Sequence, residues 1–225
     1  MRHYISIKLC LLFVLQMFAG NLFAQEKSPY FQGKISYVLN YSDFQGNNIN
    51  KKVAAFFDRE QHLYINDQNY KILDQYNNHV KLYNALTNSY FYFNRDKTAY
   101  KIDVTSKTTQ RIKVFEVEDV DTILGYACKA VKVEADFRAY IYFYSPLIKV
   151  DYHVYHNYNM EEWNAYLKAS EGALPLKVIT LDLRGKYVED KEAVSVTPML
   201  LAAADFSFPN DVKLRRLKYG LDLIW

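Results

Sequence analysis

The sequence predicts a mainly β protein of the α+β class, in which a curved antiparallel sheet or incomplete β-barrel carries one or two short helices. Apolar and polar residues alternate along most of the chain, and turn-forming residues recur about every ten residues. The composition is the third observation, because the 225 residues include 21 Tyr and 14 Phe but only 7 Gly and 5 Pro. Aromatic side chains pack well on the half-buried surface of a pleated sheet, so this composition favours strands.

Residues 25–225 are predicted to form a single antiparallel β domain. The chain is 50% hydrophobic, which is enough for one core of this size. Charged residues make up 24%, and the formal net charge of +3 is too small to favour a polyanionic partner. We therefore expect no nucleic-acid binding.

Residues 1–24 are predicted to be a secretory signal peptide. Basic residues precede the apolar run 9–15, and small residues lead to Ala24, after which we expect cleavage. An uncleaved membrane anchor is the alternative, but Gln16 ends the apolar run early. Cys10 lies inside this run and not at the cleavage point, so lipoprotein attachment is disfavoured. We expect an exported protein that is periplasmic or associated with the outer membrane.

Period-two alternation defines the predicted strands. The first strand, 33–43, places Ile35, Tyr37, Leu39 and Tyr41 on one face. Turns rich in Asn, Asp and Gly separate it from the strands that follow. In chain order these are 53–58, 62–66, 70–75, 79–84, 89–94, 98–104, 110–117, the strands within 121–142 with the Tyr-rich stretch 139–145, and 172–181.

Two short helices are expected between the strands. Asn159 is a candidate N-cap for a helix over 160–169, which places Trp163 on an apolar face. A second helix is expected over 199–204, behind a Thr-Pro pair that suits a helix start. The stretch 212–225 fits either an amphipathic helix or an alternating strand.

Cys128 is the single cysteine that remains after signal removal, so the mature chain has no internal disulfide. It is interpreted either as a reactive thiol or as a small apolar residue on a buried strand face. Tyr126 and Ala130 share its face, and Lys129 points the other way, which favours the buried interpretation.

Four short motifs carry a resemblance to a known family. The strand TILGYACKA at 122–130 resembles a strand of GLPGLI-type exported proteins of Bacteroidetes. Three more matches follow in order: AYIYFYS at 139–145, GALPL at 172–176 and DFSFP at 205–209. The resemblance implies the fold of the lipoprotein carriers LolA and LolB, an incomplete antiparallel β-barrel wrapped over helices. It also implies an apolar concavity that takes acyl chains.

The sequence shows no recognisable catalytic machinery, so we expect no enzymatic activity and no cofactor. His153 and His156 would point to opposite faces of a strand and lack further ligands, so we expect no metal. The acidic clusters 116–121 and 189–192 are interpreted as solvated strand ends and turns.

The aromatic strands either fill a β core or line a groove for a lipid, an acyl chain or another apolar ligand. On the carrier-like fold, we expect this ligand on the concave face, between the inner strand faces and the helix. The predicted lining residues are Tyr37, Phe56, Phe91, Phe93, Tyr140, Tyr142 and Trp163.

Two other function classes remain open at this stage. An envelope module that binds a protein partner through a sheet face or edge is the main alternative. A small outer-membrane β-barrel is less favoured: the chain ends on an alternating stretch to Trp225, but charged residues lie on both faces of many strands.

Overall fold

The computed structural model describes residues 28–105 and 111–216, which form one twelve-stranded sheet with short helical segments. The strands are β1 (Gly33–Asp43), β2 (Glu60–Ile65), β3 (Asn69–Asp74), β4 (His79–Asn84), β5 (Ser89–Phe93), β6 (Thr98–Ile102), β7 (Lys113–Ile123), β8 (Tyr126–Glu134), β9 (Arg138–Lys149), β10 (Ala173–Asp182), β11 (Tyr187–Pro198) and β12 (Lys213–Arg216). The helical segments are α2 (Asn50–Val53), η1 (Tyr152–Tyr155), η2 (Met160–Glu162), α3 (Trp163–Ala169) and η3 (Ala203–Phe206). The predicted signal peptide and the part of 212–225 beyond Arg216 lie outside the described residues.

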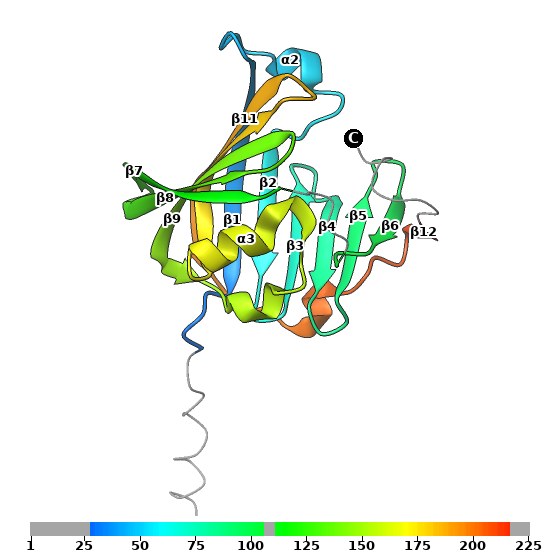
Figure 1. Cartoon of the computed structure of the whole chain (residues 1–225). Helices are drawn as coiled ribbons and strands as arrows, with labels where there is room; N and C mark the ends of the chain where they lie inside the picture. The colour runs from blue at the N-terminus through cyan, green and yellow to red at the C-terminus, as the bar shows by residue number, and fades with distance from the viewer. Residues whose placement is uncertain (1–27, 106–110, 217–225) are drawn as a thin grey trace, which may run out of the picture.

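The strand order is β12-β6-β5-β4-β3-β2-β1-β11-β10-β9-β8-β7. Two meanders, β1 to β6 and β7 to β11, join where β1 pairs antiparallel with β11 along its whole length. Strand β12 pairs in parallel with β6 at one end of the sheet. The sheet curves strongly, and α3 lies across its concave face (Figure 1). The predicted fold class, a curved antiparallel sheet with short helices, is confirmed.

The main core lies between the concave face and the segment that carries η1 and α3. Ile35 and Leu39 of β1 are buried there, and they face Tyr155, Tyr158 and Tyr166 from the helical segment. The hydroxyl of a buried tyrosine usually finds a hydrogen-bond partner. The Tyr166 hydroxyl donates to the Ala173 carbonyl oxygen at 2.8 Å, which ties α3 to the start of β10.

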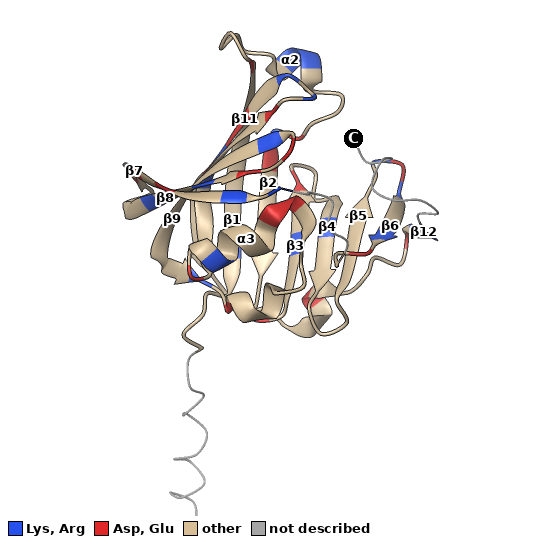
Figure 2. Cartoon of the chain, viewed as in Figure 1, with Lys and Arg blue, Asp and Glu red and all other residues tan. Residues whose placement is uncertain are grey.

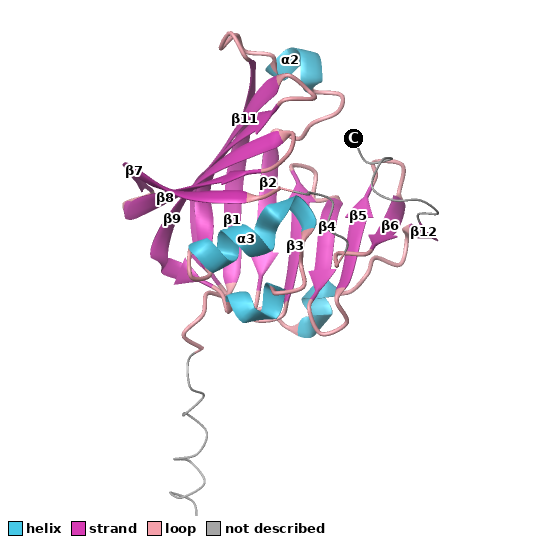
Figure 3. Ribbon diagram, in the orientation of Figure 1, coloured by secondary structure: helices cyan, strands magenta, loops and turns pink. Residues whose placement is uncertain are grey.

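A second, smaller core lies on the outer face of β4, β5 and β6. Leu82, Phe93 and Ala99 are buried there beneath Phe206 of η3. Phe208 packs on the same side, with its ring centroid 5.6 Å from that of Phe93. The sheet is therefore covered by protein on both faces in this half (Figure 3).

The GALPL turn connects α3 to β10 through a glycine that no other residue replaces easily. Gly172 has a φ of +85°, and a Cβ atom there would lie 2.2 Å from the Val150 carbonyl oxygen. Its N–H donates to the Leu167 carbonyl oxygen at 2.7 Å, which closes the last turn of α3.

The predicted helix over 160–169 is present as η2 followed by α3, so its existence is confirmed and its start is shifted. Asn159 does precede η2, but its side chain makes no capping hydrogen bond. Its amide oxygen instead accepts from Asn164 at 2.8 Å.

Three local predictions are wrong. The expected strand 53–58 is the end of α2 and a turn, because Asn48 and Asn50 bond to nearby backbone N–H groups and favour a compact connection. The expected strand 151–159 begins with the 3₁₀ turn η1, capped by the Asp151 carboxylate. The expected helix 199–204 is an extended segment over 199–202 followed by the start of η3, and only Leu201 packs on a core, which is too little to sustain a helix of this length.

Cys128 is buried on β8, which confirms the core interpretation. Its Sγ atom donates to the Tyr126 carbonyl oxygen at 3.4 Å, and burial raises the pKa of the thiol. Within the described ranges, no helix is both long enough and apolar enough to cross a membrane.

Candidate functional site

The seven predicted ligand-lining residues do not share one surface. Tyr37, Tyr140 and Tyr142 are buried on the concave side, where Trp163 of α3 also packs. The β9–β10 register places Tyr140 and Tyr142 opposite Thr180 and Val178 on this face. Four of the seven predicted residues therefore lie on the expected concave side, in an interior position.

Phe91 and Phe93 are on the outer face, so their predicted concave position is wrong. Tyr83 of β4 pairs with Tyr90 of β5, which turns Tyr90 and Tyr92 inward and the two phenylalanines outward. Both faces of this strand are aromatic, so alternation did not indicate which one meets the main core. Phe56 lies in the turn after α2 and is 79% exposed, because the predicted strand does not form there.

The inner tyrosines are packed against protein side chains. The Tyr142 ring stacks on the Tyr166 ring with centroids 3.9 Å apart and an interplanar angle of 22°. The Tyr37 hydroxyl donates to the Pro175 carbonyl oxygen at 2.7 Å. Tyr70 and Tyr158 join their hydroxyls in one hydrogen bond deeper in the core. These rings are core residues, and they contact one another where a ligand was expected.

A cluster of charged side chains lies on the concave side beside these tyrosines. Glu189 and Lys191 of β11 pair with Tyr41 and Leu39 of β1, so both face inward. The Lys191 Nζ atom donates to the Gln61 Oε1 atom at 2.9 Å and lies 4.6 Å from the centre of the Tyr37 ring. We call Lys81, Glu161, Glu189 and Lys191 the concave charged cluster.

Glu161 enters this cluster from the helical segment and forms an ion pair with Lys81 of β4. Figure 2 shows the acidic start of the helical segment against the strands. Glu161 and Glu162 both have left-handed backbone angles, with φ values of 54° and 55°. Such angles cost free energy in non-glycine residues, so the packing of η2 and α3 holds this kink in place.

Burial and neighbouring charges shift the pKa values in this cluster. Burial lowers the pKa of Lys191 to about 8, although Glu189 opposes the shift. Burial raises the pKa of Glu189, with Lys191 and the Tyr41 hydroxyl acting in the other direction. For Glu161, burial raises the pKa, but Lys81 outweighs it and the net pKa lies below its usual range.

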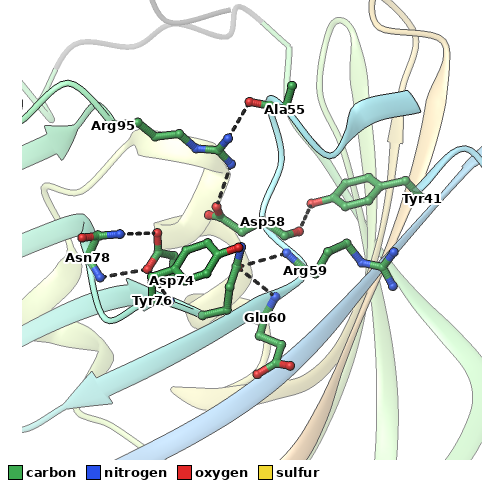
Figure 4. A network of polar contacts seen from close by, with 10 residues as sticks. Tyr41, Ala55, Asp58, Arg59, Glu60, Asp74, Tyr76, Asn78 and Arg95 are labelled. Atoms are coloured by element: carbon green, nitrogen blue, oxygen red, sulfur yellow. Dashed lines mark hydrogen bonds and ion pairs between the residues drawn. The ribbon is translucent and has the colours of Figure 1, made fainter. Parts of the chain in front are cut away.

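The loop from α2 to β2 is clamped beside this cluster by a polar network (Figure 4). The Arg95 guanidinium contacts the Asp58 carboxylate at 3.2 Å and also donates to the Ala55 carbonyl oxygen. The Tyr41 hydroxyl donates to the Asp58 carbonyl oxygen at 3.2 Å. The network holds the loop against β1 and against the turn between β5 and β6.

A groove of 590 Å³ crosses the outer face of β8 to β11, on the opposite side of the sheet from the inner tyrosines. Aliphatic side chains form most of its lining, and three charged residues complete it. The lining residues are Ala135, Ala139, Ile141, Ile179, Leu181, Leu183 and Val188, with Lys132, Glu134 and Arg138. We call this the outer groove.

The outer groove arises from strand register. Lys132 of β8 pairs with Ile141 of β9, and Ile141 pairs with Ile179 of β10, so these side chains form one row across three strands. The neighbouring row places Ala139 beside Leu181. Lys132 lies 2.6 Å from the Glu134 carboxylate on this face. The Arg138 Nε atom donates to the Asp182 carboxylate at 2.8 Å on the opposite face, the side of Tyr140.

Sequence reasoning missed both the outer groove and the concave charged cluster. The acidic stretch 189–192 was expected in solvated turns, but Glu189 lies within β11 and faces inward. A signal for the outer groove existed, because Ile141 and Ile179 place aliphatic residues on the face that alternation assigned to solvent.

The chain offers no cluster of three or more His, Cys, Asp or Glu residues arranged for a metal ion within 28–105 and 111–216. His153 and His156 are exposed, and the His156 ring nitrogen lies 2.7 Å from the His153 carbonyl oxygen.

Comparison with known proteins gives weak similarities in structure. No protein-family model and no curated protein matches the sequence. PNGF-II is 15% identical to this chain, with a TM-score of 0.48. The match covers 82% of this chain and 32% of PNGF-II, so this chain spans about a third of the length of PNGF-II. An uncharacterized conserved protein from Thermus thermophilus is 10% identical with a TM-score of 0.45, covering 83% and 91% of the two chains. A domain from Vibrio parahaemolyticus described as an outer membrane lipoprotein-sorting protein is 6% identical with a TM-score of 0.34, covering 84% and 94%.

Proposed function

We propose that the chain is an exported, non-enzymatic binding protein of the cell envelope that holds an apolar ligand, such as a lipid acyl chain, in the outer groove. The outer groove carries the proposal: it has a volume of 590 Å³ and a mostly aliphatic lining with a few charged residues. Small-molecule sites in proteins typically span about 300–1,000 Å³ and combine an apolar lining with a few polar groups. The dimensions and chemistry of the groove fit that class.

The ligand position differs from the one expected on the concave face. Tyr37, Tyr140 and Tyr142 already bury their rings against protein atoms, and a ligand there would have to displace Tyr166 or its neighbours. The outer groove requires no such displacement, because Leu181 and Leu183 are exposed to solvent. Covering these side chains with an acyl chain removes apolar surface from water and favours binding.

Lys132 favours an amphiphilic ligand with an anionic polar end. It lies in one row with Ile141 and Ile179, and the Glu134 carboxylate 2.6 Å away keeps it in place. A lipid head group with an anionic oxygen would accept hydrogen bonds from Lys132 while the chain lies on Ile141 and Ile179.

A protein-binding module remains the alternative, with β7 as its docking edge. This strand of eleven residues lies at the end of the strand order, where an added strand would pair. Its register shift between Val117 and Asp121, together with Glu116 and Glu118, is typical of edges protected against such pairing. The outer groove is therefore the better-supported site.

The test is native mass spectrometry of the protein purified from its own envelope without detergent, followed by organic extraction. We expect a bound apolar molecule in the wild type and at least tenfold less of it in Leu181→Glu, because a carboxylate in the groove opposes an acyl chain. Val194→Glu is the matched control, since Val194 is exposed on β11 outside the groove and this variant should retain the ligand.

An empty wild-type protein that also takes up no added fatty acid or phospholipid would refute the proposal. Equal ligand content in the wild type and in Leu181→Glu would place any bound molecule elsewhere. Both variants alter exposed side chains, so thermal unfolding should show that they fold like the wild type.

A further inference from the structure

We propose that one end of the sheet docks on a lipid surface through three exposed leucines. Leu86, Leu147 and Leu200 are 75%, 81% and 93% exposed, and no other leucine among the described residues exceeds 50%. They come from three distant parts of the sequence, yet the fold brings them to the same end. We call this the leucine end.

Backbone hydrogen bonds place the three leucines along one continuous rim. The Phe31 N–H donates to the Lys149 carbonyl oxygen at 2.7 Å, two residues after Leu147. The Met199 N–H donates to the Gln32 carbonyl oxygen at 3.1 Å, immediately before Leu200. The segment 31–32 therefore lies between Leu147 and Leu200.

The rim continues from Leu200 to Leu86 through the turn between β2 and β3. The Asn66 side-chain amide donates to the Leu201 carbonyl oxygen at 3.2 Å. The Ala85 N–H donates to the Gln68 carbonyl oxygen at 2.8 Å, directly before Leu86. In Figure 1 these connections lie at the lower end of the sheet, opposite α2.

The segment that carries Leu200 is unusual for an exposed connection. Residues 198–204 read PMLLAAA, seven residues without charge or hydrogen-bonding side chains. All but Leu201 are exposed. Protein surfaces that face water rarely carry an exposed apolar run of this length unless it binds something. Such a run exposes apolar area to water without stabilising the fold.

A lipid surface fits this end better than a pocketed ligand or a protein groove. The three leucines project from separate turns, and a bilayer interface accepts separate apolar side chains without a complementary shape. The exposed Lys149 lies beside them and suits lipid phosphates.

The test is co-sedimentation of the purified protein with large vesicles of phosphatidylcholine, alone and mixed with phosphatidylglycerol. We expect the wild type to bind both, with binding that persists at high salt, because apolar insertion is not screened. The double variant Leu147→Glu with Leu200→Glu should bind at least tenfold more weakly, since it places two carboxylates in the interface.

The matched control is Phe56→Glu with Tyr76→Glu. These residues are 79% and 75% exposed in turns at the opposite end of the sheet, so the control changes the same charge at similar exposure. We expect it to bind vesicles within about twofold of the wild type, which corresponds to less than about 0.5 kcal/mol. Unfolding curves should confirm that both double variants are folded.

Failure of the wild type to sediment with either vesicle would overturn the proposal, as would equal losses in the two double variants. Concentration-dependent dimerisation that the leucine substitutions abolish, without vesicle binding, would assign this end to a second copy instead. Leu181→Glu should keep full vesicle binding, so loss of ligand in the outer groove and loss of docking are separable.

Discussion

The concave and outer faces of the sheet show two ways to cover a strand surface. The concave face is covered by tyrosines from η1, α3 and the strands. The hydroxyls of Tyr37, Tyr166 and the Tyr70–Tyr158 pair reach backbone or tyrosine partners. The outer face is covered near β4 by a small phenylalanine and leucine cluster, and over β8 to β11 it is left open as an aliphatic groove. Tyrosine makes a core that is both apolar and directional, because most buried hydroxyls form a hydrogen bond of defined geometry.

The largest expected effect comes from Tyr166→Ala in the concave core. Tyr166 is fully buried, stacks on Tyr142 and donates to the Ala173 carbonyl oxygen, so truncation leaves a cavity and an unpaired acceptor. We expect a loss of roughly 3–5 kcal/mol in the free energy of unfolding, measured by urea denaturation.

Phe206→Ala in the outer cluster is the comparison for this loss. Phe206 is buried against Leu82, Phe93 and Ala99, a much smaller set of neighbours. A loss as large as that of Tyr166→Ala would show that the two faces contribute equally, and the distinction between them would fail.

The second effect concerns the concave charged cluster and depends on pH. Burial lowers the pKa of Lys191 from 10.5 in the unfolded chain to about 8, so the unfolded state binds more protons between these values. The contribution of Lys191 to stability therefore rises with pH across that window, and below pH 8 its charge opposes folding.

The variant Lys191→Met removes this titration. Its stability relative to the wild type should be highest below pH 8 and should fall by on the order of 1–2 kcal/mol toward pH 10.5, after allowance for solvent screening. Urea denaturation at several pH values measures the difference in the free energy of unfolding between the variant and the wild type. The titration of the other lysines and tyrosines contributes equally to both proteins and cancels in this difference. A difference that stays constant with pH would show that Lys191 is solvated like a surface lysine.

The smallest effect separates two buried tyrosines, one whose hydroxyl has a partner and one whose hydroxyl has none among the described residues. Tyr37→Phe removes the donor to the Pro175 carbonyl oxygen, and we expect a loss of about 1 kcal/mol. The Tyr155 hydroxyl is buried without a partner among the described residues, so Tyr155→Phe should cost nothing or stabilise slightly. Thermal unfolding of both variants provides the measurement, and equal losses would mean that the hydroxyls do not distinguish the core tyrosines.

Much of the fold was predictable because strand patterns are local. Strands β1 and β4 begin and end at the residues that alternation indicates, and GALPL marks the turn into β10. The failures lie in connections: 53–58 forms no strand and 199–204 forms no α-helix, although Phe57 and Leu201 pack on the two cores.

The candidate site was less predictable because it depends on which strands become neighbours. The aliphatic residues Ile141 and Ile179 are 38 positions apart in the sequence. Only the pairing of β9 with β10 brings them together in the outer groove. Lys191 likewise reaches Gln61 because β11 joins the first meander through β1.

The amino-acid sequence already specified the strand-rich class, the position of most strands and the burial of Cys128, since these follow from period-two alternation and residue type. Folding determined which face of each strand meets the main core. Phe91 and Tyr92 are both aromatic, so the sequence does not indicate which of them faces the interior. The register of β5 against β4 turns Tyr92 inward. The outer groove, the concave charged cluster and the leucine end were likewise assembled by long-range pairing, which no short stretch of sequence encodes.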